Sequence, residues 1–211
     1  MTFWYRLCWW AVRIAFAVWH PVFRVTGLEL VPSGKVIFCA NHSGMADPLW
    51  ILLALNDRKI LRIMAKDELR KVPVVGWFLK TFDIIFVKRG QHDTEAYQKS
   101  LEAVQNGEQM LLFIEGTRCN GDKHVRAKTG AVRLAIEGDA PLLPVFVTRN
   151  RKPFCPVTVK FGQPYAPEKA NVQDHAAMQR LSDEMLRKIY TLGGDEYADH
   201  IGEERGVLLR S

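Results

Sequence analysis

Runs of apolar residues alternate along the chain with stretches in which apolar residues recur at helical spacing. Continuous apolar runs cover 36–40, 60–64, 84–87, 110–114 and 142–147, and residues 157–161 alternate between apolar and polar. Strands that are covered on both faces read as continuous apolar runs, whereas alternation is typical of a half-exposed strand. We therefore predict five buried strands and one edge strand.

Helical patterns lie between these runs. They cover 48–55, 92–105, 128–137 and 173–192, and the last carries an apolar stripe of Met178, Leu181, Met185, Ile189 and Leu192. Short strands separated by helices favour an α/β domain with a largely parallel central sheet flanked by helices.

The N-terminal segment has a different pattern. Residues 3–23 are mostly aromatic and aliphatic, while Arg6, Arg13 and His20 recur every seven residues and so fall on one side of a helix. A membrane-spanning helix needs about 20 apolar residues, and no stretch here without a charged residue or histidine is longer than the six residues 14–19. We predict a helix that lies in the membrane interface with its arginines near lipid headgroups. An ordinary amphipathic helix packed on the domain is the alternative.

Charge narrows the choice of partner. The chain has 211 residues, with 29 Lys+Arg against 23 Asp+Glu and a net charge of +6. The basic excess is concentrated in 56–90, 118–133 and 149–160, whereas 161–211 is acidic. A basic excess favours an anionic partner, which could be nucleic acid, a membrane surface or a phosphorylated substrate. Solvated helix faces and loops would explain any single cluster equally well.

The cysteines carry no metal-binding pattern. They are Cys8, Cys39, Cys119 and Cys155, without a CxxC pair or zinc-finger spacing. We expect no metal site, and free thiols in a reducing compartment. With the interfacial helix, this predicts a membrane-associated protein on the cytoplasmic face, divided into a membrane-associating segment, 1–28, and a domain, 29–211.

A histidine and a carboxylate follow the first buried strand. His42 and Asp47 are separated by four residues in a loop that leads into a helix. A carboxylate bonded to one imidazole nitrogen leaves the other nitrogen free to take a proton from an alcohol. Asp47 before Pro48 could instead be a simple helix N-cap. Ser43 and Cys119 could be nucleophiles, but neither has the sequence context of a known nucleophile elbow.

Further strand ends carry cations and small polar residues. They are Lys66, Lys88 with Arg89, Glu115-Gly116-Thr117-Arg118, and Lys128 before Gly130. Glycine permits a close backbone approach, and arginine presents a planar fork suited to phosphate. Because active sites of such sheets lie at the carboxyl ends of the strands, we predict a base and several anion contacts at one sheet edge. Such a site suits group transfer to or from a phosphorylated alcohol.

Four ordered sequence blocks resemble those of the glycerolipid acyltransferases, in particular the 1-acylglycerol-3-phosphate acyltransferases. They are Asn41-His42-x4-Asp47, Phe82–Arg89, Phe113-Ile114-Glu115-Gly116-Thr117-Arg118 and Ala140–Val145. The resemblance covers roughly residues 33–165. Two positions depart from it, since Ile114 stands where the family often has proline and Cys119 where serine is common.

The resemblance implies a glycerolipid acyltransferase fold over 29–211 and acyl transfer from acyl-CoA or acyl carrier protein to lysophosphatidate. His42 would be the base and Asp47 its orienting carboxylate, and no metal or cofactor would be needed. The substrate-binding residues would be Lys66, Arg89, Glu115, Gly116, Thr117 and Arg118. Membrane lipids are then the expected partners and nucleic acid is not. Another lyso-lipid, aminolipid or glycolipid acceptor is the alternative.

Overall fold

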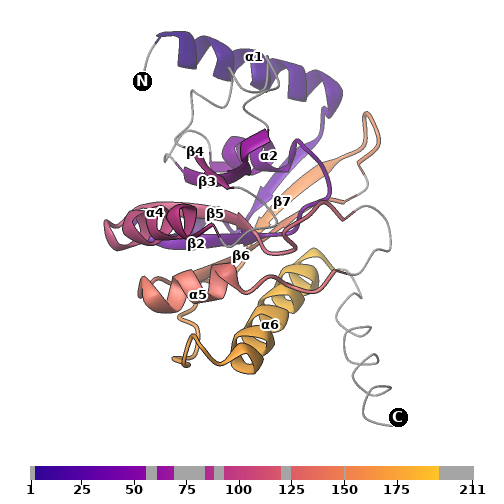
Figure 1. Ribbon diagram of the computed structural model, residues 1–211. Helices are drawn as coiled ribbons and strands as arrows, with labels where there is room; N and C mark the ends of the chain where they lie inside the picture. The colour runs from indigo at the N-terminus through magenta and orange to yellow at the C-terminus, as the bar shows by residue number, and fades with distance from the viewer. Residues whose placement is uncertain are drawn as a thin grey trace.

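The computed structural model describes residues 3–55, 61–68, 84–87, 93–119, 125–149 and 151–194. A seven-stranded sheet with the order β1-β7-β6-β2-β5-β3-β4 runs through its centre (Figure 1). The strands are β1 (Phe23–Thr26), β2 (Val36–Ala40), β3 (Leu61–Lys66), β4 (Ile84–Val87), β5 (Gln109–Phe113), β6 (Leu142–Val147) and β7 (Val157–Phe161). Every neighbouring pair is parallel except β6 with β7. The predicted α/β fold with a largely parallel sheet is confirmed.

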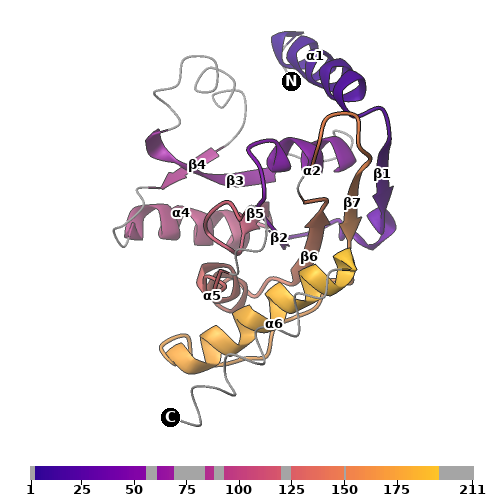
Figure 2. The same cartoon turned by 90° about the vertical axis from the view of Figure 1, so that its right-hand side faces the viewer.

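Helices cover both faces of the sheet (Figures 1 and 2). One face packs against α4 (Thr94–Gln105), α5 (Gly130–Glu137) and α6 (His175–Gly193), and the other against α2 (Asp47–Leu55). Ile37 and Cys39 of β2 belong to the first apolar cluster, whereas Phe38 and Ala40 belong to the second. The continuous apolar run of β2 is thus explained, because successive side chains of a strand enter opposite cores.

The sheet begins earlier in the chain than the sequence indicated. Strand β1 pairs in parallel with β7 and forms the sheet edge, so β7 is an interior strand rather than the predicted edge strand. The alternation in β7 remains, because Thr158 and Lys160 are only half-buried. The 3-10 helix η1 (Leu28–Leu30) follows β1. The sheet therefore starts inside the segment 1–28 that was assigned to membrane association.

Helix α1 (Phe3–Trp19) lies outside the α2 layer (Figure 1). Its Phe16 ring packs 4.5 Å from the Trp50 ring of α2, measured between centroids. The placement of His20 with the arginines on one side of this helix was wrong. His20 lies beyond the end of α1 and is only 7% exposed, with Nδ1 2.8 Å from the Cys155 carbonyl oxygen. Among the described helices, none is both long and apolar enough to cross a membrane.

Candidate active site

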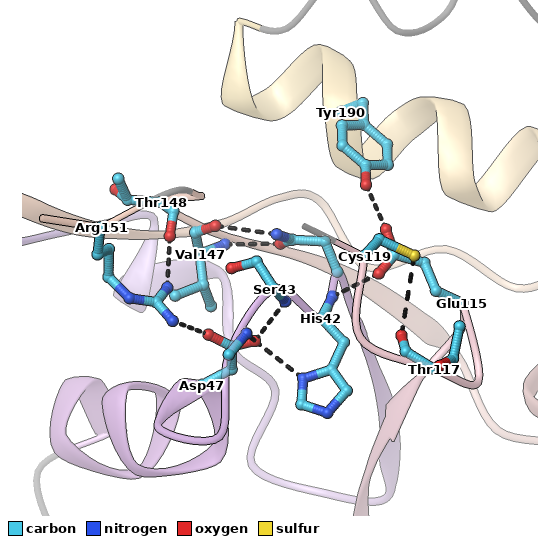
Figure 3. A network of polar contacts seen from close by, with 12 residues as sticks. His42, Ser43, Asp47, Glu115, Thr117, Cys119, Val147, Thr148, Arg151 and Tyr190 are labelled. Atoms are coloured by element: carbon cyan, nitrogen blue, oxygen red, sulfur yellow. Dashed lines mark hydrogen bonds and ion pairs between the residues drawn. The ribbon is translucent and has the colours of Figure 1, made fainter. Parts of the chain in front are cut away.

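The carboxyl ends of β2, β5 and β6 converge on one group of polar side chains (Figure 3). Strand β2 lies between the other two, and Asn41 follows it directly. The Asn41 carboxamide donates to the Val147 carbonyl oxygen at 2.9 Å and accepts from the Val147 N–H at 2.8 Å. This side chain continues the ladder between β2 and β6 by one step and so fixes where the following loop leaves the sheet.

The predicted His42–Asp47 pair is formed. The distance between His42 Nδ1 and Asp47 Oδ2 is 2.9 Å, and Asp47 has no exposed surface. The same oxygen accepts the backbone N–H groups of Ser43 at 2.6 Å and Gly44 at 2.8 Å. All these partners precede α2, so the carboxylate turns back into its own loop. The Asp47 side chain therefore does not cap the N-terminus of α2, and the N-cap alternative was wrong.

The donors around Asp47 determine the imidazole tautomer. Backbone N–H groups can only donate, so Asp47 Oδ2 accepts from them. An accepting oxygen pairs with a nitrogen that bears hydrogen, which assigns the hydrogen to His42 Nδ1. In the neutral imidazole, Nε2 is then the unprotonated nitrogen. This is the arrangement that a general base requires.

Two further contacts orient His42. Its ring stacks on Phe113 at the end of β5, with centroids 4.2 Å apart and an interplanar angle of 26°. Its backbone N–H donates to Glu115 Oε2 at 2.8 Å. The imidazole is 15% exposed, so it remains accessible to a substrate while most of its surface is covered.

Glu115 links this loop to α6. Its other oxygen, Oε1, accepts the hydroxyl of Tyr190, and the residue is 1% exposed. Burial raises the pKa of the Glu115 carboxyl. The hydrogen bonds from Tyr190, the His42 N–H and Cys119, and the charge of Arg149, act in the opposite direction. The carboxylate thus points into the protein, where it holds the backbone of the loop after β2, residues 41–47 (the catalytic loop).

The rest of the Glu-Gly-Thr-Arg segment forms a tight turn on the surface. Gly116 has φ +65°, and a Cβ there would lie 2.7 Å from Lys128 Cγ. Thr117 and Arg118 are exposed. The Cys119 N–H donates to the His42 carbonyl oxygen at 2.7 Å. Arg118 therefore directly precedes Cys119, whose backbone N–H is bonded to His42.

Comparison with known proteins identifies the family. A family model described as Acyltransferase matches residues 22–148, more than half of the chain. The chain belongs to this acyltransferase family. It is 32% identical to the 1-acyl-sn-glycerol-3-phosphate acyltransferase of Bacillus subtilis over 142 residues. This aligned region covers 66% of this chain and 69% of the relative.

Other relatives of the acyltransferase carry different names. The lyso-ornithine lipid O-acyltransferase of Pseudomonas aeruginosa is 30% identical over 145 residues, which cover 68% of this chain and 53% of the relative. The similarity to the relative of the same name from Rhodobacter capsulatus covers 41% of that protein. This chain thus spans about half, or less, of the length of these two relatives.

Among solved structures, the chain is similar to the 1-acyl-sn-glycerophosphate acyltransferase PlsC of Thermotoga maritima. The TM-score is 0.61 at 25% sequence identity, and the match covers 82% of this chain and 72% of the other.

The structure describes only some of the remaining predicted site residues of the acyltransferase. Lys66 ends β3, which is parallel to β5, so their carboxyl ends lie on the same side of the sheet. Arg89, like Lys88, lies outside the described residues. The Ser43 hydroxyl is buried and has no hydrogen-bond partner in the described part of the chain. Cys119 is buried with its thiol toward the Thr117 carbonyl. Neither side chain is arranged as an activated nucleophile.

Two residues of the site were not predicted. Arg151 contacts Asp47, and Tyr190 contacts Glu115 (Figure 3). Arg151 lay within the basic stretch 149–160, which gave no sign of which cation is buried. Tyr190 directly follows Ile189 of the predicted apolar stripe and turns a polar atom inward, which no spacing rule indicates.

Proposed function

We propose that this acyltransferase moves an acyl chain from acyl-CoA or acyl carrier protein to the free hydroxyl of 1-acyl-sn-glycerol 3-phosphate. The product is phosphatidate, and the role is phospholipid biosynthesis. The observation that carries the proposal is the His42–Asp47 pair, whose imidazole is partly exposed beside the Arg118 turn. The names of the Bacillus and Thermotoga relatives support the same acceptor.

The chemical step uses His42 as a proton carrier. Nε2 takes the hydroxyl proton while the acceptor oxygen attacks the thioester carbonyl carbon. The tetrahedral intermediate then collapses, the carbon–sulfur bond breaks, and the leaving thiolate takes the proton from the imidazolium. Asp47 balances the imidazolium charge between these two transfers. We propose that the step needs no metal or cofactor, and such a base contributes about 10²–10⁴-fold to the rate.

Arg118 is the proposed phosphate contact of the acceptor. It is exposed, and the next residue is bonded to the His42 backbone. An arginine fork can hold a phosphate through two parallel hydrogen bonds. Lys66 and Arg89 are further proposed anion contacts. We assign Gly116 and Thr117 to the shape of the acceptor site, and Glu115 to holding their turn against the His42 loop.

A lyso-ornithine lipid is the second candidate acceptor, because the Pseudomonas and Rhodobacter relatives are named for that substrate. It presents the same kind of hydroxyl but no phosphate. An acceptor without a phosphate would not bind the Arg118 guanidinium in this way. The effect of replacing Arg118 therefore distinguishes lysophosphatidate from lyso-ornithine lipid as the acceptor.

The test is a panel of purified protein with acyl-CoA or acyl carrier protein as donor and lysophosphatidate, lyso-ornithine lipid or lysophosphatidylcholine as acceptor. We expect the highest kcat/KM with lysophosphatidate. In Arg118→Ala we expect the KM for lysophosphatidate to rise more than the KM for the donor, while exposed Arg126→Ala serves as control. Faster transfer to lyso-ornithine lipid, unaffected by Arg118→Ala, would assign the other acceptor.

We also propose that the protein binds membrane lipids, at the cytoplasmic face, through its N-terminal helix. Among the described side chains of α1, the large apolar ones that are exposed are Trp10, Ile14, Val18 and Trp19, with exposures of 57–70%. Spacings of four residues place the first three on one face of the helix. Phe16 holds the other face against Trp50, so the apolar stripe is directed outward, as a bilayer contact requires.

A further inference from the structure

Arg151 is the only described partner of the second oxygen of Asp47. It lies four residues beyond the end of β6, in the loop that leads to β7, and its side chain is 9% exposed. One terminal nitrogen, Nη2, bonds to Asp47 Oδ1, and the other, Nη1, bonds to the Thr148 carbonyl oxygen (Figure 3). The guanidinium therefore bridges the catalytic loop after β2 and the loop after β6.

The catalytic loop is shaped to admit this guanidinium. A Cβ at position 44 would lie 2.8 Å from Arg151 Nη2, closer than real Cβ contacts, so Gly44 leaves the room that Nη2 occupies. The same glycine donates its N–H to Asp47 Oδ2 at 2.8 Å. With donors on both oxygens, the carboxylate cannot rotate without losing several hydrogen bonds at once.

The charge of Arg151 also balances that of the Asp47 carboxylate. Among the described residues, the titratable or charged groups at the imidazole and its backbone are Asp47 from α2, Glu115 and Cys119 from the turn after β5, and Arg151 behind Asp47. The side chains of Arg151 and Asp47 are both buried, and a buried charge is costly unless it is paired. Arg151 therefore holds the Asp47 carboxylate in the position from which it contacts His42 Nδ1.

We propose that Arg151 is a positioning residue of the acyl-transfer reaction. It fixes the Asp47 carboxylate and balances its charge, so that Asp47 holds the His42 ring in place and in the tautomer with hydrogen on Nδ1. This inference rests on the proposed function. The competing role, a phosphate ligand for the substrate, is disfavoured because both terminal nitrogens of Arg151 are already bonded to protein oxygens.

The kinetic test compares Arg151→Gln and Arg151→Lys with wild type, and uses exposed Lys152→Gln as the matched control. In Arg151→Gln we expect kcat to fall at least about tenfold, but less than the about 10²–10⁴-fold contribution of the base itself. Both KM values should change less than about twofold. Arg151→Lys should recover part of kcat, because it restores the charge without the bridge to Thr148. A raised acceptor KM at unchanged kcat would overturn the proposal in favour of a phosphate ligand.

A double-mutant cycle separates positioning from general destabilisation. If Arg151 acts through Asp47, adding Arg151→Gln to Asp47→Asn should lower kcat no further than about twofold, because coupled residues are not additive. If the fold-losses in kcat of the two single variants multiplied in the double variant, the proposal would be overturned. Wild-type transfer in the same assay tests the proposed function independently of either result.

A spectroscopic measurement tests the proposal without activity. In protein with ¹⁵N-labelled histidine, with the His42 signals assigned by their loss in His42→Ala, wild type should show His42 in the Nδ1–H tautomer alone. Folded Arg151→Gln should show a mixture of the two neutral tautomers. An unchanged His42 spectrum in Arg151→Gln would overturn the positioning role.

Discussion

Asp47 and Glu115 are both buried carboxylates, yet their surroundings assign them different tasks. Asp47 has an arginine, two backbone N–H groups and an imidazole as partners, so its charge is balanced inside the protein. Glu115 has a tyrosine hydroxyl, a backbone N–H and Cys119 as hydrogen-bond partners, and burial remains the largest effect on its pKa. The first is suited to support an imidazolium during the reaction. The second holds the loop that carries the imidazole.

The raised pKa of Glu115 makes part of the folding stability pH-dependent. The folded chain holds the Glu115 proton above the ordinary value of 4.5, so it binds more protons than the unfolded chain. The Glu115 contribution to the free energy of unfolding is therefore greatest below that value and falls as the pH rises through the folded-state pKa. Glu115→Gln removes this dependence, while its amide can still accept from His42 N–H and donate to Tyr190.

We expect wild type to lose stability relative to Glu115→Gln as the pH is raised from about 4.5. The measurement is urea unfolding of both proteins across a pH series, and exposed Glu102→Gln on α4 is the control that should follow wild type. If the free energy of unfolding of wild type minus that of Glu115→Gln stayed constant or increased with pH, the result would contradict this account.

At the scale of elements, the catalytic residues come from loops after parallel strands, and their positions depend on sheet register. The sequence was sufficient to predict β2 and β6 at their observed bounds, because a strand covered on both faces leaves a continuous apolar run. The bounds of β4 were also predicted, but its prediction as a buried strand was wrong, since β4 forms a sheet edge and only its Ile85 is buried. It could also predict the His42–Asp47 pair, because both residues lie in one short loop.

Features that depend on distant parts of the chain escaped prediction. Strand β1 has four residues with alternating burial, and only its pairing with β7 makes it a strand. The contact between Arg151 and Asp47 joins residues 104 positions apart, and that between Tyr190 and Glu115 joins residues 75 apart. Nothing local in the sequence distinguishes these residues from an exposed cation or a core aromatic.

The junction between β1 and η1 offers a test of the added edge strand. Gly27 has φ +74°, and a Cβ there would lie 2.0 Å from the backbone oxygen of Phe161 in β7. Gly107 has φ +88° and no heavy atom within 4 Å of its Cβ position. Both alanine variants bear the cost of a left-handed conformation, about 1–2 kcal/mol, but only Gly27→Ala also meets the neighbouring strand.

We expect Gly27→Ala to lower the free energy of unfolding by about 1–3 kcal/mol more than Gly107→Ala does, the usual cost of overpacking. Urea denaturation of the two variants measures the difference directly. Equal losses would mean that β1 and η1 do not lie against β7 as the sheet order requires.

At the scale of the whole molecule, the exposed large apolar side chains among the described residues gather on three segments. Four of those described belong to α1, Val22 follows it, and the other two are Met45 in the catalytic loop and Phe154 in the loop between β6 and β7. The N–H of Phe154 donates to the Trp19 carbonyl oxygen at 2.9 Å, so this loop adjoins the end of α1 (Figure 2). The proposed bilayer contact thus extends from α1 toward the loop that carries Arg151.

We expect Phe154→Ser and the double variant Trp10→Ser with Ile14→Ser to weaken sedimentation with anionic lipid vesicles, because each removes apolar surface from the contact. The control is Phe86→Ser on β4, which is half-buried and belongs to neither segment. Full vesicle binding by the Trp10 and Ile14 double variant would contradict the interfacial role of α1.

The central claim is that His42 takes the acceptor hydroxyl proton during acyl transfer. Its most direct test is the steady-state rate of transfer from acyl-CoA to lysophosphatidate by wild type, His42→Ala and the exposed-histidine control His175→Ala. We predict that His42→Ala lowers kcat by about 10²–10⁴-fold, with an unchanged unfolding midpoint, and that His175→Ala keeps the wild-type rate. Near-wild-type transfer by folded His42→Ala would contradict the account.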